Sequence, residues 1–156
     1  MGIDGTKRWS VKALSSGQEP LAIYCDERPL TQTALATLDN VSPVEYLLIA
    51  VASCFALSCR AVLATRKLPA LAFEVAVTGA KAADAPSRLQ RIGLTAIFHG
   101  GVNDAQAASI AAAAKLLCTV TNTIFAAPTI AVTGLSVAQA AENAVPTDVV
   151  DSPPHR

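Results

Sequence analysis

A long segment without glycine or proline limits the folds that are open to this chain. Just before it, Ser42, Pro43 and Glu45 have the spacing of a helix start. Ser42 would be the N-cap residue, Pro43 the first helical residue, and Glu45 would complete a capping box by reaching back to Ser42. The segment predicts a helix that runs to about Lys67 and ends at Pro69, because proline interrupts the hydrogen bonding of a helix.

The apolar residues of this helix are spread around its surface rather than confined to one stripe, which indicates burial on most sides. The longest apolar stretch, residues 46–57, is shorter than the roughly 20 residues that cross a bilayer. The first residues of the chain have no long apolar core, so they do not resemble a secretory signal. We therefore expect a soluble, cytoplasmic protein with no membrane partner.

Strand-like segments lie on both sides of the helix. They cover residues 8–14, 21–25 and 30–38 before it, and residues 71–78, 89–98 and 129–135 after it. The first two segments are separated by a turn and predict an N-terminal β-hairpin, whereas residues 80–87 read as a loop. This order of strands and helices predicts an α+β fold with an antiparallel sheet packed on a long central helix.

A second, alanine-rich helix is expected to begin at Asn103 or Asp104 and to run to about Cys118. Residues 119–123 would form a short continuation or a turn. The length of the chain predicts a single domain, which we assign to residues 1–139. Residues 140–156 contain several prolines and few large apolar residues, so we expect a loose C-terminal tail.

The composition favours association with a second copy and excludes some other partners. Apolar residues make up 52% of the chain and charged residues 15%, against a usual charged share of about 25%. Such a chain has too few polar residues to cover itself, so we expect a homodimer. A net charge of zero and few aromatic residues give no support for nucleic-acid binding.

The four cysteines are the candidates for chemistry. They are Cys25, Cys54, Cys59 and Cys118, and none forms a C-x-x-C pair. The two histidines stand apart from any ligand-like spacing, and His99 reads as a turn residue, so we expect no metal and no cofactor.

Each cysteine has a structural and a chemical interpretation. Cys54 and Cys118 lie on separate helices, where they could be inert core thiols or a peroxide-reducing pair. Cys59 is five residues past Cys54 and points to another face of the helix, so we expect it in the core. Cys25 lies in a predicted strand and is expected to be structural.

Two segments resemble the OsmC/Ohr family of osmotically inducible and organic hydroperoxide resistance proteins. Residues 42–54, SPVEYLLIAVASC, are similar to its central helix with the first cysteine, and residues 116–124, LLCTVTNTI, are similar to its second cysteine segment. The separation of the two cysteines fits the family, as do the strands at 73–79 and 91–98. The resemblance covers about residues 42–125.

The resemblance implies an intertwined homodimer in which two long helices pack back to back across the sheets. It also implies thiol-dependent reduction of hydroperoxides, often organic ones and possibly including hydrogen peroxide. Cys54 would be the peroxidatic sulfur, Cys118 the resolving one, and an external thiol or dithiol the reductant. The alternative is a dimer of this fold without strong peroxidase activity, which binds a small apolar molecule in the interface cleft.

A catalytic thiolate in an apolar site needs support from a positive charge. Family peroxidases use an arginine from the hairpin, held by a glutamate directly after the proline; here that position is Val44. Glu45 comes one residue later, and on an ideal helix it would lie on the face opposite Cys54. Glu45 is therefore either a site residue or only a capping residue. Arg28, with Arg8 as the other choice, is the candidate for the arginine.

Overall fold

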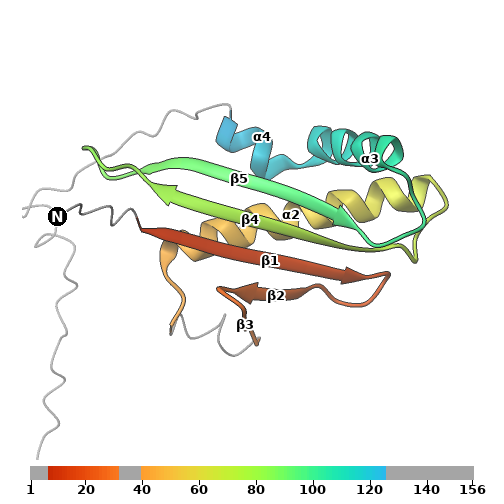
Figure 1. The fold of residues 1–156 in the computed structure, drawn as a ribbon, viewed down its shortest axis with the longest axis horizontal. Coiled ribbons are helices and arrows are strands. Elements are labelled where there is room, and N and C mark those ends of the chain that lie inside the picture. Colours follow the sequence, from red (N-terminus) through yellow and green to blue (C-terminus); the bar gives the residue numbers. More distant parts are fainter. Residues whose placement is uncertain (1–6, 32–39, 126–156) are drawn as a thin grey trace, which may run out of the picture.

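A five-stranded antiparallel sheet with a long helix on one face forms the body of the molecule (Figure 1). The computed structural model describes residues 7–31 and 40–125. The strands are β1 (Arg8–Ser16), β2 (Ala22–Cys25), β3 (Arg28–Pro29), β4 (Ala72–Lys81) and β5 (Leu89–Phe98), in the order β3-β2-β1-β4-β5. The helices are α2 (Pro43–Thr65), α3 (Asp104–Leu117) and α4 (Thr119–Phe125). The predicted α+β fold with an antiparallel sheet is therefore confirmed.

The alternation of side chains gives the sheet one buried and one open face. In β1, Trp9, Val11 and Ala13 are buried on the face that packs against α2, while the residues between them are more exposed. The same alternation holds in β4, where Phe73 and Val75 are buried. Because side chains in a strand point alternately to opposite faces, the core forms between the sheet and α2.

The start of α2 follows its local sequence. The Ser42 hydroxyl accepts a hydrogen bond from the Glu45 N–H at 3.3 Å, and a Glu45 carboxylate oxygen accepts one from the Ser42 N–H at 2.6 Å. The predicted capping box is thus confirmed. The end of the helix differs from the prediction, because α2 stops at Thr65, and Lys67 adopts a left-handed backbone conformation before Pro69 is reached.

One side of α2 is apolar and open. Leu47 is 40% exposed and Leu57 is 55% exposed, so the expectation that this helix is buried on most sides is wrong for the single chain. The whole helix, rather than residues 46–57 alone, is long and apolar enough to suit a membrane span, but half of its most apolar window is buried inside the folded chain. Packing against the sheet and against α3 and α4 accounts for that half, and the exposed side of α2 remains available for a further contact.

The described elements after α2 match the predictions in type. Strand β4 continues to Lys81, into the predicted loop, and β5 has the predicted bounds. Gly100 and Gly101 turn the chain with positive φ, and Asn103 caps α3. The short segment after Cys118 is helix α4. Most of the strand predicted at 30–38, the strand at 129–135 and the tail at 140–156 lie outside the described residues.

Candidate functional site

Two thiols from helices that are distant in the sequence meet beside the core. Cys54 lies in the middle of α2 and is partly buried, whereas Cys118 is the residue between α3 and α4 and is fully buried. Both cysteines are free thiols, and the Cys118 side chain lies close enough to Cys54 to act on its pKa. The structure therefore brings together the two sulfurs that the resemblance had singled out.

The backbone of Cys118 is held on both sides. Its N–H donates to the Ala114 carbonyl at 3.0 Å, as in the last turn of a helix. Its own carbonyl accepts from the Asn122 N–H at 3.1 Å and from the Thr121 hydroxyl at 3.1 Å. Cys118 thus ends α3 and begins α4, and this double role fixes where its side chain leaves the backbone.

Burial dominates the electrostatics of Cys54. It raises the pKa of the Cys54 thiol above its ordinary value, and the neighbouring Cys118 thiol raises the pKa further. The backbone N–H groups of Val120 and Thr119 act in the opposite direction, because their dipoles favour the anionic sulfur. Within the described part of the chain, no cationic side chain is among the groups that set this pKa.

An apolar hollow of about 570 Å³ lies close to the thiols, although neither cysteine lines it. Its walls come from α2 through Val51 and Phe55, from β5 through Leu94, from α3 through Ala111, and from α4 through Thr121. Phe55 follows Cys54 in the chain, and Thr121 is bonded to the Cys118 carbonyl. Pockets of this size and character suit small apolar ligands. Lys115 and Arg91 add two positive charges to the lining.

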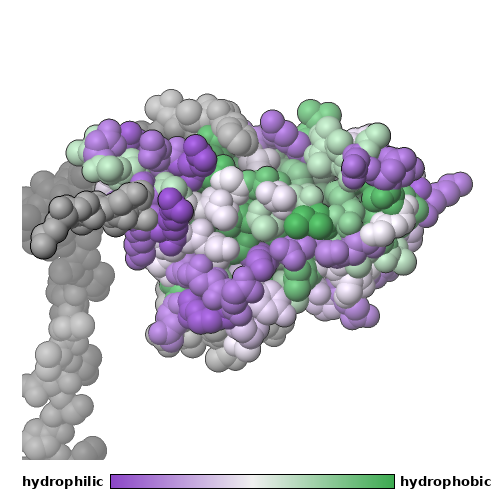
Figure 2. Space-filling view, in the orientation of Figure 1, coloured by the Kyte–Doolittle hydropathy of each residue, from purple (hydrophilic) through white to green (hydrophobic). Residues whose placement is uncertain are grey.

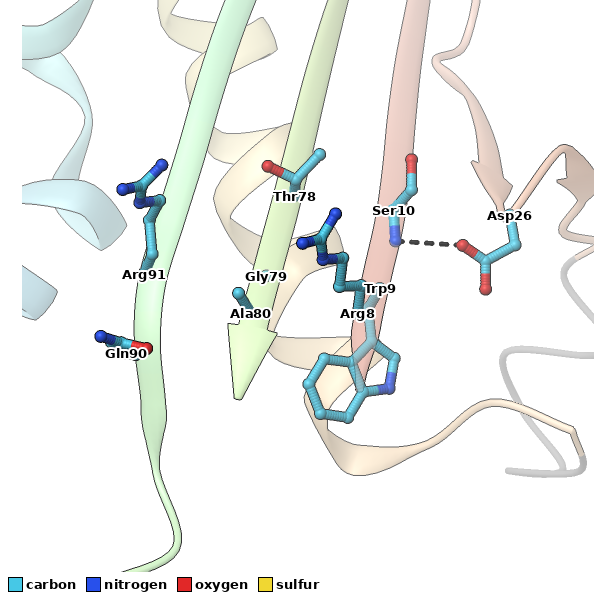
Figure 3. Close-up of a pocket in the computed structure, with 9 residues that line it drawn as sticks. All are labelled: Arg8, Trp9, Ser10, Asp26, Thr78, Gly79, Ala80, Gln90 and Arg91. Atoms are coloured by element: carbon cyan, nitrogen blue, oxygen red, sulfur yellow. Dashed lines mark hydrogen bonds between the residues drawn. The ribbon is translucent and has the colours of Figure 1, made fainter. Parts of the chain in front are cut away.

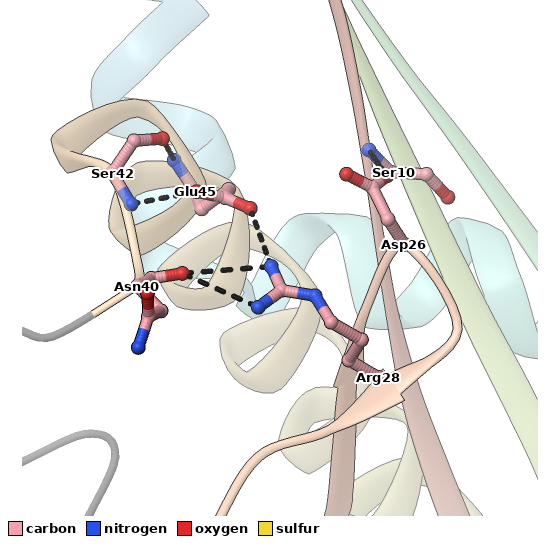
Figure 4. A network of polar contacts seen from close by, with 6 residues as sticks. All are labelled: Ser10, Asp26, Arg28, Asn40, Ser42 and Glu45. Carbon is pink, nitrogen blue, oxygen red and sulfur yellow. Dashed lines mark hydrogen bonds and ion pairs between the residues drawn. The ribbon is translucent and has the colours of Figure 1, made fainter.

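The predicted arginine and glutamate form an ion pair at the start of α2 (Figure 4). An Arg28 guanidinium nitrogen lies 3.6 Å from a Glu45 carboxylate oxygen, and both terminal nitrogens of Arg28 lie 3.5 Å from the Asn40 carbonyl. Burial alone would raise the pKa of Glu45, but the hydrogen bonds with Ser42 and the charge of Arg28 bring it below its ordinary value. Glu45 is therefore both a capping residue and an ion-pair partner.

This ion pair and the thiol pair lie in different places. Glu45 precedes Cys54 by nine residues, which is two and a half helical turns or about 13 Å along the axis. The charges of Arg28 and Glu45 act instead on Cys25, whose pKa is raised to about 11, mainly by burial. The described residues therefore do not bring Arg28 or Glu45 to Cys54. Arg8 lies on the open face of the sheet, away from both.

The other predicted roles concern residues with structural positions. Cys59 is fully buried in the core, and burial raises its pKa to about 12, with a further contribution from Cys118. Cys25 is fully buried on β2. The His99 N–H donates to the Ala72 carbonyl at 2.9 Å in the turn after β5. Among the described residues, no group of histidine, cysteine and acidic side chains could hold a metal ion.

Sequence reasoning missed two features of the thiol site. The N–H groups of Thr119 and Val120 face Cys54, but backbone groups leave no trace in residue types. The hollow has walls from four elements, so its outline depends on how they pack. One sequence signal could have indicated these N–H groups: no glycine or proline directly follows Cys118. This favours a helix there, and the first N–H groups of a helix have no partner within it.

Comparisons with known proteins agree with this fold. A family model described as OsmC-like protein matches residues 36–133. The chain is similar to the crystal structure of an OsmC-like hydroperoxide resistance protein from Jannaschia sp. CCS1, at 16% identity and a TM-score of 0.52, covering 79% of this chain and 89% of that one. A search of curated proteins found no match. At this identity the structural likeness supports the fold alone, but the family model spans more than half of the sequence, and the chain therefore belongs to the OsmC-like protein family.

Proposed function

We propose that this protein is a dithiol peroxidase that reduces organic hydroperoxides, with Cys54 as the attacking sulfur and Cys118 as the resolving one. The observation that carries the proposal is the contact between these two free thiols beside an apolar hollow. An apolar hollow favours peroxides with an organic group over hydrogen peroxide, because burial of apolar surface supplies the binding energy. Free thiols of this kind fit a reducing cytoplasm.

The reaction proceeds in three balanced steps. The Cys54 thiolate attacks the distal oxygen of the hydroperoxide, the O–O bond breaks, and the alcohol leaves after it takes a proton, which gives a Cys54 sulfenic acid. The Cys118 thiol then attacks the sulfenic sulfur, which forms the Cys54–Cys118 disulfide and releases water. An external dithiol restores both thiols by exchange and becomes a disulfide itself.

The thiolate is supported here by backbone groups instead of an arginine. The N–H groups of Thr119 and Val120 lower the pKa of Cys54, whereas burial and Cys118 raise it, and the net shift is upward. Since only the thiolate is nucleophilic, a small fraction of the protein is reactive at neutral pH. We therefore expect a slow peroxidase at pH 7 with a strong response to alkaline pH.

A homodimer completes the proposal. Leu47 and Leu57 are exposed and lie on the same side of α2 as Cys54, at 100° per residue. A second copy covering this side would bury the apolar residues and enclose Cys54. We expect Leu57→Lys to produce monomers in sedimentation experiments. Ile97→Lys, an equally apolar and exposed position on the open face of the sheet, should leave the dimer intact, and monomeric wild-type protein would refute this part.

The direct test is rapid mixing of the reduced protein with cumene hydroperoxide. We expect Cys54→Ser to slow the reaction by at least about 1000-fold, since it removes the nucleophile. Cys25→Ala, at a buried thiol away from Cys118, is the matched control and should react like the wild type. Peptide mapping after one equivalent of peroxide should find the Cys54–Cys118 disulfide. Peroxide consumption that survives Cys54→Ser would disprove the assignment.

The second candidate is a binding protein for a small apolar molecule. The raised pKa of Cys54 favours this candidate, since no cationic side chain in the described part of the chain is among the groups that set that pKa. It predicts saturable binding of an apolar probe in the hollow, unchanged by Cys54→Ala, and a reaction with cumene hydroperoxide no faster than that of free cysteine. A fast second-order reaction would decide for the peroxidase.

A further inference from the structure

The open face of the sheet carries a second depression, whose lining differs in character from that of the hollow near the thiols. It has a volume of about 760 Å³ and lies where β1 begins, β4 ends and β5 begins (Figure 3). Hydrophilic residues gather over this end of the sheet (Figure 2). Most of the depression's lining residues are charged or polar, whereas the hollow near Cys54, with which it shares Gln90 and Arg91, is mainly apolar. The depression therefore suits a ligand of different chemistry.

Two arginines stand in one cross-strand row of this depression. Arg8 on β1 pairs with Ala80 on β4, and Ala80 pairs with Arg91 on β5. The next row, formed by Ser10, Thr78 and Gly93, points to the same face, because it is two residues away on each strand. Figure 3 shows the two guanidinium groups on either side of Thr78. Small residues between them leave the space open.

Neither guanidinium is neutralised within the described part of the chain. The other described arginines each have a side-chain partner: Arg28 has Glu45, Arg60 has Ser15, Arg66 has Ser109 and Arg88 has Asp84. Asp26 also borders the depression, but its carboxylate accepts the Ser10 N–H at 3.1 Å.

Arg8 and Arg91 lie on the two strands that flank β4, and the lining holds these two guanidinium groups against one carboxylate, that of Asp26. The lining is therefore net positive, and its field would draw anions to the site.

The spacing selects the class of anion. The two arginines are separated by one strand, which puts their backbones about 9–10 Å apart, a gap that two long side chains can span around one ligand. A carboxylate has two oxygens in one plane and is satisfied by a single guanidinium. A phosphoryl group has oxygens in several directions, so two arginines and a hydroxyl can bind it together.

We propose that Arg8 and Arg91, with the Thr78 hydroxyl between them, bind the phosphoryl group of a small phosphorylated ligand on the open face of the sheet. This site does not involve the thiols or rest on the proposed peroxidase activity, although Arg91 also lines the hollow near Cys54. The ligand would be a phosphate monoester or a diphosphate, since both present the oxygens that this row of donors can reach.

Calorimetric titration of the full chain with inorganic diphosphate tests the proposal. We expect saturable binding by the wild type and by Cys54→Ser. Arg8→Gln and Arg91→Gln should each weaken it about tenfold, the loss of one charge-assisted pair. Arg91→Lys should weaken it several-fold, because lysine keeps the charge without the planar fork. Arg88→Gln is the matched control, with the same change in charge at a paired arginine nearby, and should stay within twofold.

Three results would overturn the site. The first is no saturable binding of diphosphate by the wild type at about 1 mM, the weak limit of specific recognition. The second is an equal loss of affinity in Arg88→Gln, which would mean that diffuse charge attracts the anion. The third is equal competition by acetate, which would exclude phosphoryl selectivity. Circular dichroism spectra of the variants, all at exposed positions, should match the wild type.

Discussion

The N-terminal end of α2 and its middle carry different chemistry, although both hold residues predicted for one site. At the end, Glu45 joins the capping box and pairs with Arg28. In the middle, Cys54 meets Cys118 and backbone N–H groups. The ion pair at the start of the helix stabilises that start. The Cys54 thiol lies two and a half turns away, so its anion needs stabilising groups of its own. The comparison teaches that a shared helix does not make a shared site.

The largest expected effect comes from filling the apolar hollow. Ala111→Phe would occupy the space beside Phe55, so we expect the rate with cumene hydroperoxide to fall about 100-fold, the equivalent of about 2.7 kcal/mol. The rate with hydrogen peroxide should stay within threefold, because this small substrate does not need the hollow. Ala83→Phe, at an exposed position in the loop between β4 and β5, controls for the added ring.

Equal slowing with both peroxides would move the binding site elsewhere. In that case the apolar surroundings of the thiols would not explain how the peroxide binds, and the difference between the thiol site and the polar helix start would have no role in function.

The second effect is the pH dependence of the reaction. Because the pKa of Cys54 is raised, the thiolate is the minor form at neutral pH and its share grows as pH rises. We expect the second-order rate constant with cumene hydroperoxide to increase about tenfold per unit between pH 6 and pH 8. A rate that is flat over this range would show a thiolate already formed, and hence a cation supplied by a partner subunit.

A smaller effect is expected from removing the helix cap. Ser42→Ala deletes the hydroxyl that accepts the Glu45 N–H, so the free energy of unfolding should fall by about 1 kcal/mol in urea titrations. The peroxide rate should not change. Ser16→Ala, at the exposed end of β1, is the matched control and should unfold like the wild type. If Ser42→Ala also lowered the peroxide rate, the start of α2 and the thiol site would be functionally coupled.

The smallest effect is the one that could break the comparison. Arg28 is 53% exposed at the side chain, so its pair with Glu45 contributes less than about 1 kcal/mol. We expect Arg28→Gln to lower stability by that amount and to leave the peroxide rate within threefold. Arg88→Gln removes a similar exposed pair and serves as control. A 100-fold loss of rate in Arg28→Gln alone would place this arginine at Cys54 in the working assembly.

Local sequence patterns predicted the elements well. The capping box at Ser42 and the bounds of β5 followed from a few neighbouring residues, because such features depend on local hydrogen bonds and alternation. The prediction that Glu45 lies away from Cys54 followed from helix geometry alone. The meeting of Cys54 and Cys118 required the family resemblance.

Other features could not be predicted from one sequence. The Arg28–Glu45 pair depends on how the hairpin folds back to the start of α2, and the row of Arg8 and Arg91 depends on strand register. The exposed side of α2 was misjudged because its hydropathy is similar all round, so composition cannot say which side the sheet will cover. These features belong to packing between elements, and no local pattern encodes them.

The position of Cys118 between two helices has a consequence for how long the protein would stay active in the presence of peroxide. The backbone of Cys118 is held by hydrogen bonds on both sides, so the residue loses little conformational entropy when its sulfur forms a bond. Its effective concentration towards a sulfenic acid is therefore high. The disulfide would then form faster than a second peroxide molecule could react with the sulfenic acid. That second reaction would oxidise the sulfur irreversibly to sulfinic acid. Catalytic lifetime would thus be set by the junction of α3 and α4 rather than by the reacting cysteine itself.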